Sequence, residues 1–202
     1  MSFFMLCIEA NHFLSDDMAA RMKKAVDEEE SPLGKQILTQ LQENLQIAGD
    51  DMIPICQDTG MAVVFIKLPI EMDRNVIYYM GPSPAREGRP IGSAGPTTAS
   101  RMDKYAPNLI DLGLGAMIGK GKRSQAVIDA VVRNGCVYFA AVGGAGALLS
   151  KRILSSEVVA YDDLGTEAIR KLQVTDFPVI VVIDSEGNNL YETAIREYEK
   201  KV

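Results

Sequence analysis

The segment "SQAVIDAVVRNGCVYFAAVGG" (residues 124–144) decides the fold class, because a helix pattern is followed directly by a strand pattern. Its first part has the pattern of a helix, with Gly135 at the position expected for a C-terminal cap. Its second part is a short apolar run that leads into a glycine-rich turn, which is typical of a buried strand. The segment therefore predicts one helix–strand unit.

The same alternation continues from residue 76 toward the C-terminus. Further strands are predicted in four apolar segments: 76–81, 113–119, 155–163 and 177–184. Further helices are predicted in three segments: 145–153, 165–174 and 192–202. Strands that alternate with helices predict an α/β fold with buried, largely parallel strands.

Two helices are predicted before this region, in residues 9–30 and 31–51. Ser15 is expected to be the N-cap of the first helix, and Gly49 is expected to end the second. The second helix carries an apolar stripe at helical spacing, made of Leu33, Ile37, Leu41 and Leu45.

A boundary between two regions is predicted near residue 72. The apolar segment 61–69 is expected to be a strand that ends at a proline, and the short polar segment 70–75 follows it. We therefore divide the chain into residues 1–72, a small helical segment with one strand, and residues 73–202, the α/β domain.

The composition excludes several classes of function. The chain has 202 residues and a net charge of −6, and an acidic chain lacks the basic face that nucleic-acid binding needs. No segment approaches the roughly 20 apolar residues of a membrane span, and the N-terminus lacks the pattern of a signal peptide. We expect a cytoplasmic protein with no nucleic-acid and no membrane partner.

The three cysteines, Cys7, Cys56 and Cys136, are odd in number and far apart. This pattern favours a reducing compartment over a disulfide framework. His12 is the single histidine, which argues against histidine-based triads and metal sites with several histidines. Cys136 is expected to lie in the core, and Cys7 and His12 are expected to be structural.

The strongest candidate for chemistry is the stretch "GSAGPTTASRMDKYAP" (92–107), together with "GAMIGKGKRS" (115–124). Glycines and a proline permit a sharp backbone path that exposes amide donors. Thr97 and Thr98 add hydroxyls, Arg101 can grip a carboxylate with two parallel hydrogen bonds, and Lys120 lies between two glycines. These residues predict a pocket for a small anion, most economically a carboxylate. The alternative is a structural turn in which Arg101 pairs with Asp103 or with a surface acid.

The segment "PICQDTGMAVVF" (54–65) is a second candidate. Cys56, Gln57 and Asp58 stand side by side just before a predicted strand. Cys56 could offer a thiolate to a metal or an iron–sulfur cluster, and Asp58 could transfer a proton. The alternative is a plain turn in which Asp58 bonds nearby backbone groups and Cys56 is a buried apolar residue.

The glycine-rich segment "VGGAGA" (142–147) follows a predicted strand but does not match G-x-G-x-x-G. Its glycines are expected to allow close packing or to line a pocket, in preference to binding a nucleotide.

Two regions of the chain resemble the class I, iron–sulfur fumarate hydratases and their L-tartrate dehydratase relatives. "ESPLGKQILTQLQENLQIAGDDMIPICQDTGMAVVF" (30–65) is similar to part of the N-terminal, α-type region of that family. "VIYYMGPSPAREGRPIGSAGPTTASRMDKYAP", "MIGKGKRS", "VYFAAVGGAGALLSKRI", "AYDDLGTEAI" and "DFPVIVVIDSEGNNLY" are similar to most of its C-terminal, β-type region. The resemblance implies a swivelling β/β/α domain and a hydro-lyase that adds water to, or removes it from, a dicarboxylate.

The resemblance also implies a [4Fe–4S] cluster held by three protein thiolates, which acts on the substrate as a Lewis acid. Cys56 matches the first cluster cysteine of the family. Gln57 matches a position that contacts substrate, and Asp58 matches a position that transfers protons. The segment that carries the two further cluster cysteines of the family is absent between residue 69 and the next predicted strand, and neither Cys7 nor Cys136 lies in a matching motif.

In the β-type region the resemblance implies that Thr97 is a catalytic hydroxyl, and that Lys120 is a cation beside the substrate that also assists catalysis. Thr98 and Arg101 are implied to bind substrate, with Arg101 on a carboxylate. Because the set of cluster ligands is incomplete, we expect a homodimer or a complex with a cluster-bearing α-type subunit. The alternative is a non-catalytic remnant or a dicarboxylate-binding subunit.

Overall fold

The structure is a computed structural model that describes residues 11–56 and 75–199. The α-helices among them are α2 (Asp16–Glu28), α3 (Pro32–Asp51), α4 (Ala106–Asp111), α5 (Gln125–Asn134), α6 (Gly146–Lys151) and α7 (Leu190–Glu199). The strands among them are β1 (Val76–Tyr78), β2 (Ala116–Gly119), β3 (Val137–Ala140), β4 (Ile153–Ala160), β5 (Ile169–Val174) and β6 (Ile180–Ile183). Two short 3₁₀ helices are also present, η1 (Ala99–Met102) and η2 (Asp162–Glu167).

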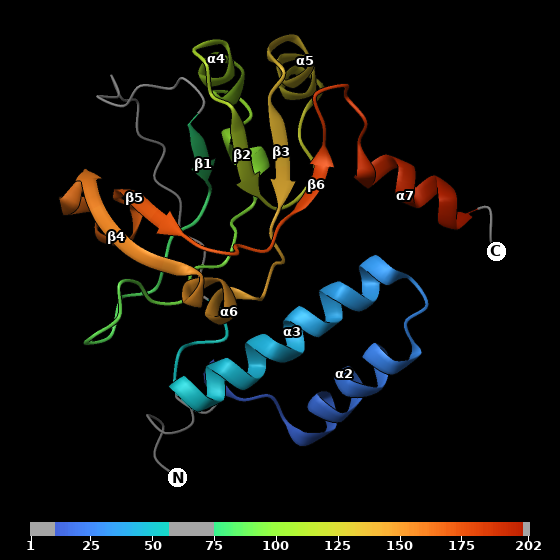
Figure 1. Ribbon diagram of the computed structural model, residues 1–202, viewed down its shortest axis with the longest axis vertical. Helices are drawn as coiled ribbons and strands as arrows, with labels where there is room; N and C mark the ends of the chain where they lie inside the picture. Colours follow the sequence, from blue (N-terminus) through green and yellow to red (C-terminus); the bar gives the residue numbers. More distant parts are fainter. Residues whose placement is uncertain (1–10, 57–74, 200–202) are drawn as a thin grey trace. The chain divides into compact units, whose positions relative to one another are not determined.

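Four of the strands form one sheet in the order β1-β2-β3-β6, as Figure 1 shows. The neighbours β1, β2 and β3 are parallel, with Met117 in register with Ile77 and with Tyr138. β6 lies antiparallel to β3 at the edge of the sheet. The α/β class is confirmed, and the prediction of largely parallel strands holds for three of these four.

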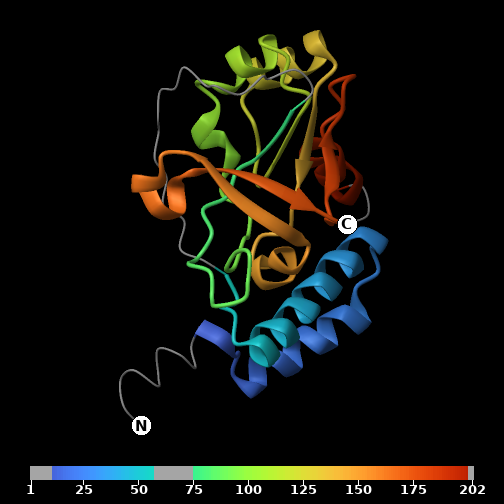
Figure 2. The ribbon, with the colours of Figure 1, turned by 60° about the vertical axis from the view of Figure 1, so that its left-hand side comes forward.

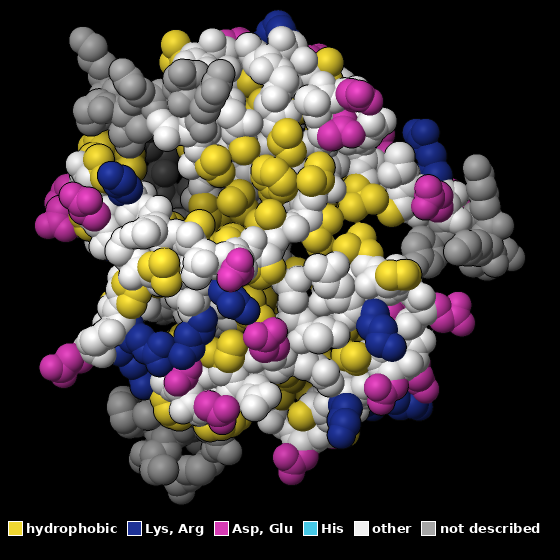
Figure 3. Space-filling model, in the orientation of Figure 1, with side chains coloured by type: hydrophobic (Ala, Val, Ile, Leu, Met, Phe, Trp, Pro, Cys, Tyr) yellow, Lys and Arg dark blue, Asp and Glu magenta, His cyan; other side chains and the backbone are white. Residues whose placement is uncertain are grey.

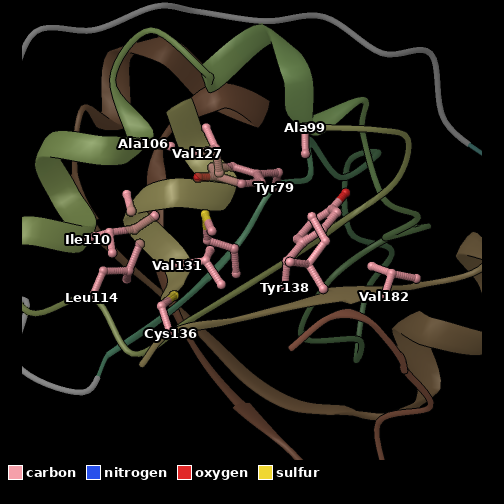
Figure 4. Close-up of a cluster of buried hydrophobic side chains, with 13 residues drawn as sticks. Tyr79, Ala99, Ala106, Ile110, Leu114, Val127, Val131, Cys136, Tyr138 and Val182 are labelled. Carbon is pink, nitrogen blue, oxygen red and sulfur yellow. The ribbon is translucent and has the colours of Figure 1, made fainter. Parts of the chain in front are cut away.

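The core of this sheet is built where α4 and α5 pack with β2 and β3. Its fully buried side chains include Ile110, Val127, Val131, Met117 and Tyr138, of which all but Met117 are labelled in Figure 4. Helix α5 ends at Gly135, which has a left-handed conformation (φ 65°), as the sequence predicted. Hydrophobic side chains also gather over the sheet in the view of Figure 3. Val181 of β6 is half exposed.

The described residues fall into two compact units, and the chain passes between them more than once. One unit consists of residues 11–56, 81–95 and 142–177, and the other of residues 75–80, 96–141 and 178–199. The first contains helices α2, α3 and α6 and the two-stranded ribbon of β4 and β5, which is visible in Figure 2. The second contains the four-stranded sheet with α4, α5 and α7.

The helix predicted in residues 165–174 is wrong. Residues 169–174 form strand β5, which pairs antiparallel with β4, for example Ser156 with Leu172. The chain reaches this strand through Gly165, whose backbone angles (φ 60°, ψ −111°) no helix contains. Pairing with a distant strand therefore overrides the local helical pattern of a short segment.

The N-terminal helices are confirmed, with two corrections. Helix α3 continues past Gly49 to Asp51 and ends at Met52, which takes the left-handed conformation that was expected of a glycine. Its buried positions are Gln40, Asn44 and Ala48, whereas the predicted apolar stripe is only half buried. The buried face is therefore displaced by about one residue, because Asn44 has backbone partners there.

Ser15 occupies the N-cap position of α2, but its hydroxyl donates to the Asp17 carboxylate (2.6 Å) and makes no capping bond to the helix. This hydrogen bond lowers the pKa of Asp17.

The predicted strand at 61–69 and the division at residue 72 lie outside the described residues. None of the described helices combines the length and the apolar character needed to cross a membrane.

Candidate functional site

The predicted anion-binding loop lies at the carboxyl ends of the parallel strands β1 and β2. The Thr97 N–H donates to the carbonyl of Tyr79, just beyond β1 (2.8 Å). Thr98 pairs in parallel with Lys120, which directly follows β2. The Lys120 N–H donates to Thr97 (3.1 Å) and the Ala99 N–H donates to Lys120 (2.9 Å). Two segments that are about 20 residues apart in sequence are thus joined where open α/β sheets bind ligands.

Three polar side chains of this loop pair, those of Thr97, Arg101 and Lys120, have no hydrogen-bond or ion-pair partner among the described residues. Thr97 is only 8% exposed, and its Oγ1 has no hydrogen-bond partner among the described residues. Arg101, in η1, is exposed, and Lys120 is half buried. Neither cation belongs to an ion pair within the described part of the chain. A buried hydroxyl and two unpaired cations are a suitable set for an anionic ligand.

The alternative pairing of Arg101 with Asp103 or a surface acid is not found among the described residues. Asp103 instead accepts a hydrogen bond from Nε of Arg123 (2.6 Å) and another from the backbone N–H of Ser124 (2.5 Å). The side chain of Arg123 is fully buried. Asp103 is therefore occupied by a neighbouring loop, and Arg101 is left available for a ligand.

Arg123 is the residue that sequence reasoning missed. Its guanidinium lies against two aromatic rings, 5.5 Å from the ring centre of Tyr79 and 5.0 Å from that of Tyr138. Its Nη1 also donates to the sulfur of Met117 (3.2 Å). The one sequence signal was an arginine directly before a predicted helix in "GKGKRS", which gives no sign of burial.

Two tyrosine hydroxyls hold the glycine that follows Lys120. Tyr138 donates to the carbonyl of Gly121, and the Gly121 N–H donates to the hydroxyl of Tyr191, each at 3.1 Å. Burial raises the pKa of Tyr138 and of Tyr79, so both hydroxyls stay neutral at physiological pH. The backbone that carries Lys120 is therefore fixed on both sides.

The predicted thiol site is described in part. Cys56 is half buried, and the carbonyl of the preceding Ile55 accepts a hydrogen bond from the amide of Asn44 (3.1 Å). Gln57 and Asp58 lie outside the described residues. Cys136 lies in the core, as predicted, and burial raises the pKa of its thiol, which opposes a role as a thiolate ligand.

These residues do not fit a complete iron–sulfur site. A [4Fe–4S] cluster with one open iron requires three thiolates. No group of three or more His, Cys, Asp or Glu side chains placed to hold a metal occurs among residues 11–56 and 75–199.

The glycines of "VGGAGA" and of the "GSAG" segment have packing roles. A side chain at Gly144 would contact Leu41 of α3, and the Gly144 carbonyl accepts from the amide of Asn44 (2.9 Å). A side chain at Gly92 would collide with the backbone of Ser83 and Pro84. Gly92 thus permits close approach of two backbones, whereas Gly144 packs against the side chain of Leu41, which supports the prediction of close packing for "VGGAGA".

Comparison with known proteins gives two family matches. The profile described as "Fumarase C-terminus" matches residues 55–194, and the profile described as "Fumarate hydratase (Fumerase)" matches residues 2–79.

Individual relatives agree with the family matches. The anaerobic class I fumarate hydratase of Escherichia coli is 42% identical over 134 residues, which is 65% of this chain and 24% of that protein. Fumarate hydratase 2 of Leishmania major is 40% identical over 63% of this chain and 23% of that protein. A putative L(+)-tartrate dehydratase subunit beta of Methanocaldococcus jannaschii is 36% identical over 66% of this chain and 72% of that protein. The matched segment spans about a quarter of the fumarate hydratases and most of the tartrate dehydratase subunit.

Proposed function

Because the chain belongs to the class I fumarate hydratase family, we propose that it is the β-type component of a hydro-lyase. The reaction would be the reversible hydration of a small dicarboxylate, either fumarate to malate or, in the dehydrating direction, tartrate to oxaloacetate. One observation carries the proposal: Thr97, Arg101 and Lys120 lie in two loops that pair at the ends of β1 and β2, and none of their polar side chains has a partner within residues 11–56 and 75–199.

Arg101 and Lys120 would bind the carboxylates of the substrate. The Arg101 guanidinium matches the two oxygens of one carboxylate, whereas Lys120 supplies a compact positive charge. Removal of a proton next to a carboxylate moves negative charge onto its oxygens. Cations fixed beside those oxygens stabilise this charge more in the transition state than in the ground state.

The proton transfers are proposed for Thr97 and Asp58. Thr97 is nine-tenths buried, and the positive charge of Lys120 would lower the barrier to deprotonation of the Thr97 hydroxyl. Asp58 offers a carboxylate for the second proton transfer. Thr98 and Gln57 would hydrogen-bond the substrate. The backbone pairing of Thr98 with Lys120 supports this role for Thr98, because it places the two residues side by side.

The family resemblance implies a [4Fe–4S] cluster, for which Cys56 would be one ligand. Because the described residues do not supply the other thiolates, we propose that the active form is an oligomer. It would be either a homodimer or a complex with a cluster-bearing α-type subunit, in the cytoplasm. One relative is named as a tartrate dehydratase subunit beta, and this supports the second arrangement. We also propose the swivelling β/β/α arrangement for residues 73–202, and the helical α-type fragment for residues 1–72.

Calorimetric titration of the full chain with malate, fumarate and L-tartrate tests the proposal. We expect binding of at least one diacid, and the change Lys120→Met should weaken it about tenfold or more. A hydrogen bond to a charged group contributes about 1.5–3 kcal/mol, which corresponds to that loss. Lys122→Met is the matched control, because Lys122 is an exposed lysine two residues away. Equal losses in both variants, or no binding to the unmodified chain, would contradict the proposed site.

The second candidate is a dicarboxylate-binding subunit without its own chemistry. The incomplete set of cluster ligands among the described residues favours it. Diacid binding in the titration, together with no turnover when a cluster-bearing fumarate hydratase chain is added, would support this candidate.

A further inference from the structure

We propose that Asp103 and Arg123 form a buried clamp that positions Thr97, Arg101 and Lys120 for the substrate. The expected effect of the clamp on substrate affinity rests on the proposed function. Its expected effect on the contact between the two loops does not depend on that function. Neither clamp residue is proposed to touch the substrate.

Asp103 links the two loops directly. It lies one residue beyond η1, which carries Arg101, and it accepts hydrogen bonds from Arg123 and from the Ser124 N–H in the loop after Lys120. The only other direct bonds between these loops that the structure describes are the backbone bonds around Lys120. The two loops are thus connected at two places, by the backbone pairing of Thr98 with Lys120 and by the hydrogen bonds of Asp103 with Arg123 and Ser124.

Arg123 is held firmly enough to serve as the anchor. Its side chain is fully buried and contacts the rings of Tyr79 and Tyr138, which belong to the segments of β1 and β3. Tyr138 also donates to Gly121, the residue after Lys120. The guanidinium therefore connects Asp103 to the same aromatic residue that fixes the Lys120 backbone.

The energetics favour a positioning role over a simple stabilising role. Burying two charges costs several kcal/mol per ion, so an apolar pair of similar volume is often as stable or more stable. One Arg123 nitrogen, Nη2, has no partner among the described residues, which adds to the cost. The pair therefore contributes a fixed geometry between two loops more than it contributes stability.

Amide hydrogen exchange on the full chain, followed by NMR, tests the structural part. In Asp103→Asn the amides of Ala99 and Lys120 should exchange at least about tenfold faster than in the unmodified chain, because local opening becomes easier. The amide of Ala141, which bonds Gly119 within the sheet, should be unchanged. Asp111→Asn is the matched control, because it removes a carboxylate from an exposed ion pair with Arg133 in the same unit. Unchanged exchange at Ala99 and Lys120 would overturn the clamp.

The double variant Asp103→Asn/Arg123→Met separates positioning from stability. It leaves no unpaired buried charge, so its unfolding midpoint should recover toward that of the unmodified chain. Its amide exchange at Ala99 and Lys120 should stay fast, and its affinity for the diacid should be about tenfold weaker than that of the unmodified chain. Recovery of slow exchange or of affinity would show that the pair acts only through stability and would overturn the proposal.

The two proposals fail in different ways. If the unmodified chain binds no diacid, the proposed function fails, and the exchange rates at Ala99 and Lys120 still decide the clamp. If the chain binds a diacid and Asp103→Asn binds it equally well, the clamp fails and the proposed function stands.

Discussion

Asn44 shows how one buried polar residue can organise the surroundings of a candidate site. Its amide donates to the carbonyls of Ile55 and Gly144, and its Oδ1 accepts from the Leu148 N–H (2.9 Å). Three backbone segments of one unit therefore meet at a single side chain: helix α3, the segment that leads to Cys56, and the start of α6. Both the amide nitrogen and the oxygen of its side chain therefore bond to protein groups.

We predict that Asn44→Ala lowers the free energy of unfolding by about 3 kcal/mol, because it leaves buried backbone groups without partners. Urea unfolding, followed by circular dichroism, measures the change. Gln46→Ala, at an exposed position of the same helix, should change the free energy by less than about 0.5 kcal/mol. A loss below about 1 kcal/mol for Asn44→Ala would show that water replaces the missing bonds.

At this residue scale, the sequence points to some residues of the candidate site and not to others. Thr97 and Lys120 stand out because each is a polar residue beside glycine or proline, and Arg101 stands out as a cation four residues after Thr97. Such local chemistry is visible in the sequence. Arg123 looks like one more surface cation, because its burial depends on Tyr79 and Tyr138, two aromatic residues from distant segments. Contacts of that kind leave no local pattern.

At the scale of elements, helix α5 and strand β5 show the same difference between local patterns and contacts with distant segments. Helix α5 is predictable because its periodicity and its terminal glycine are local features. Strand β5 is not predictable in this way, because a pairing partner decides its conformation, and the same residues satisfy a helical pattern. The link between β4 and β5 depends on Gly165, which has backbone angles that are accessible almost only to glycine.

We predict that Gly165→Ala lowers the free energy of unfolding by about 1–3 kcal/mol, which is the usual cost of a strained backbone conformation. The cost is conformational, because no atom lies within 4 Å of the position that a Cβ would occupy. Gly81→Ala is the control, since its Cβ would make an ordinary 3.7 Å contact with the Thr166 carbonyl. Equal unfolding midpoints for the two variants would contradict the backbone geometry assigned to η2.

At the scale of the whole molecule, the chain and its relatives differ most in length. The matched segment spans 24% of the anaerobic fumarate hydratase and 72% of the tartrate dehydratase subunit. Under the proposed function, the loops with Thr97 and Lys120 would complete a site to which another polypeptide contributes. Arg101 and Lys120, which have no ion-pair partner among the described residues, would then form one side of that shared pocket.

The final prediction concerns the cluster. When the purified chain is incubated anaerobically with iron and sulfide, we expect much less than one [4Fe–4S] cluster per chain, because three thiolates are required and the described residues supply one accessible thiol, Cys56. Visible absorbance and iron analysis measure the occupancy. Adding a chain that corresponds to the unmatched N-terminal part of the Escherichia coli enzyme should raise both occupancy and fumarate hydration.

Two cysteine variants make this prediction specific. Cys56→Ser should remove the gain in hydration if Cys56 is a cluster ligand, whereas Cys136→Ala should retain it, because the Cys136 thiol is buried in the core. Full occupancy in the chain alone would contradict the shared site and would point to thiols outside the described residues. Equal activity of Cys56→Ser and the unmodified chain would instead remove Cys56 from the cluster and leave all its ligands to the partner.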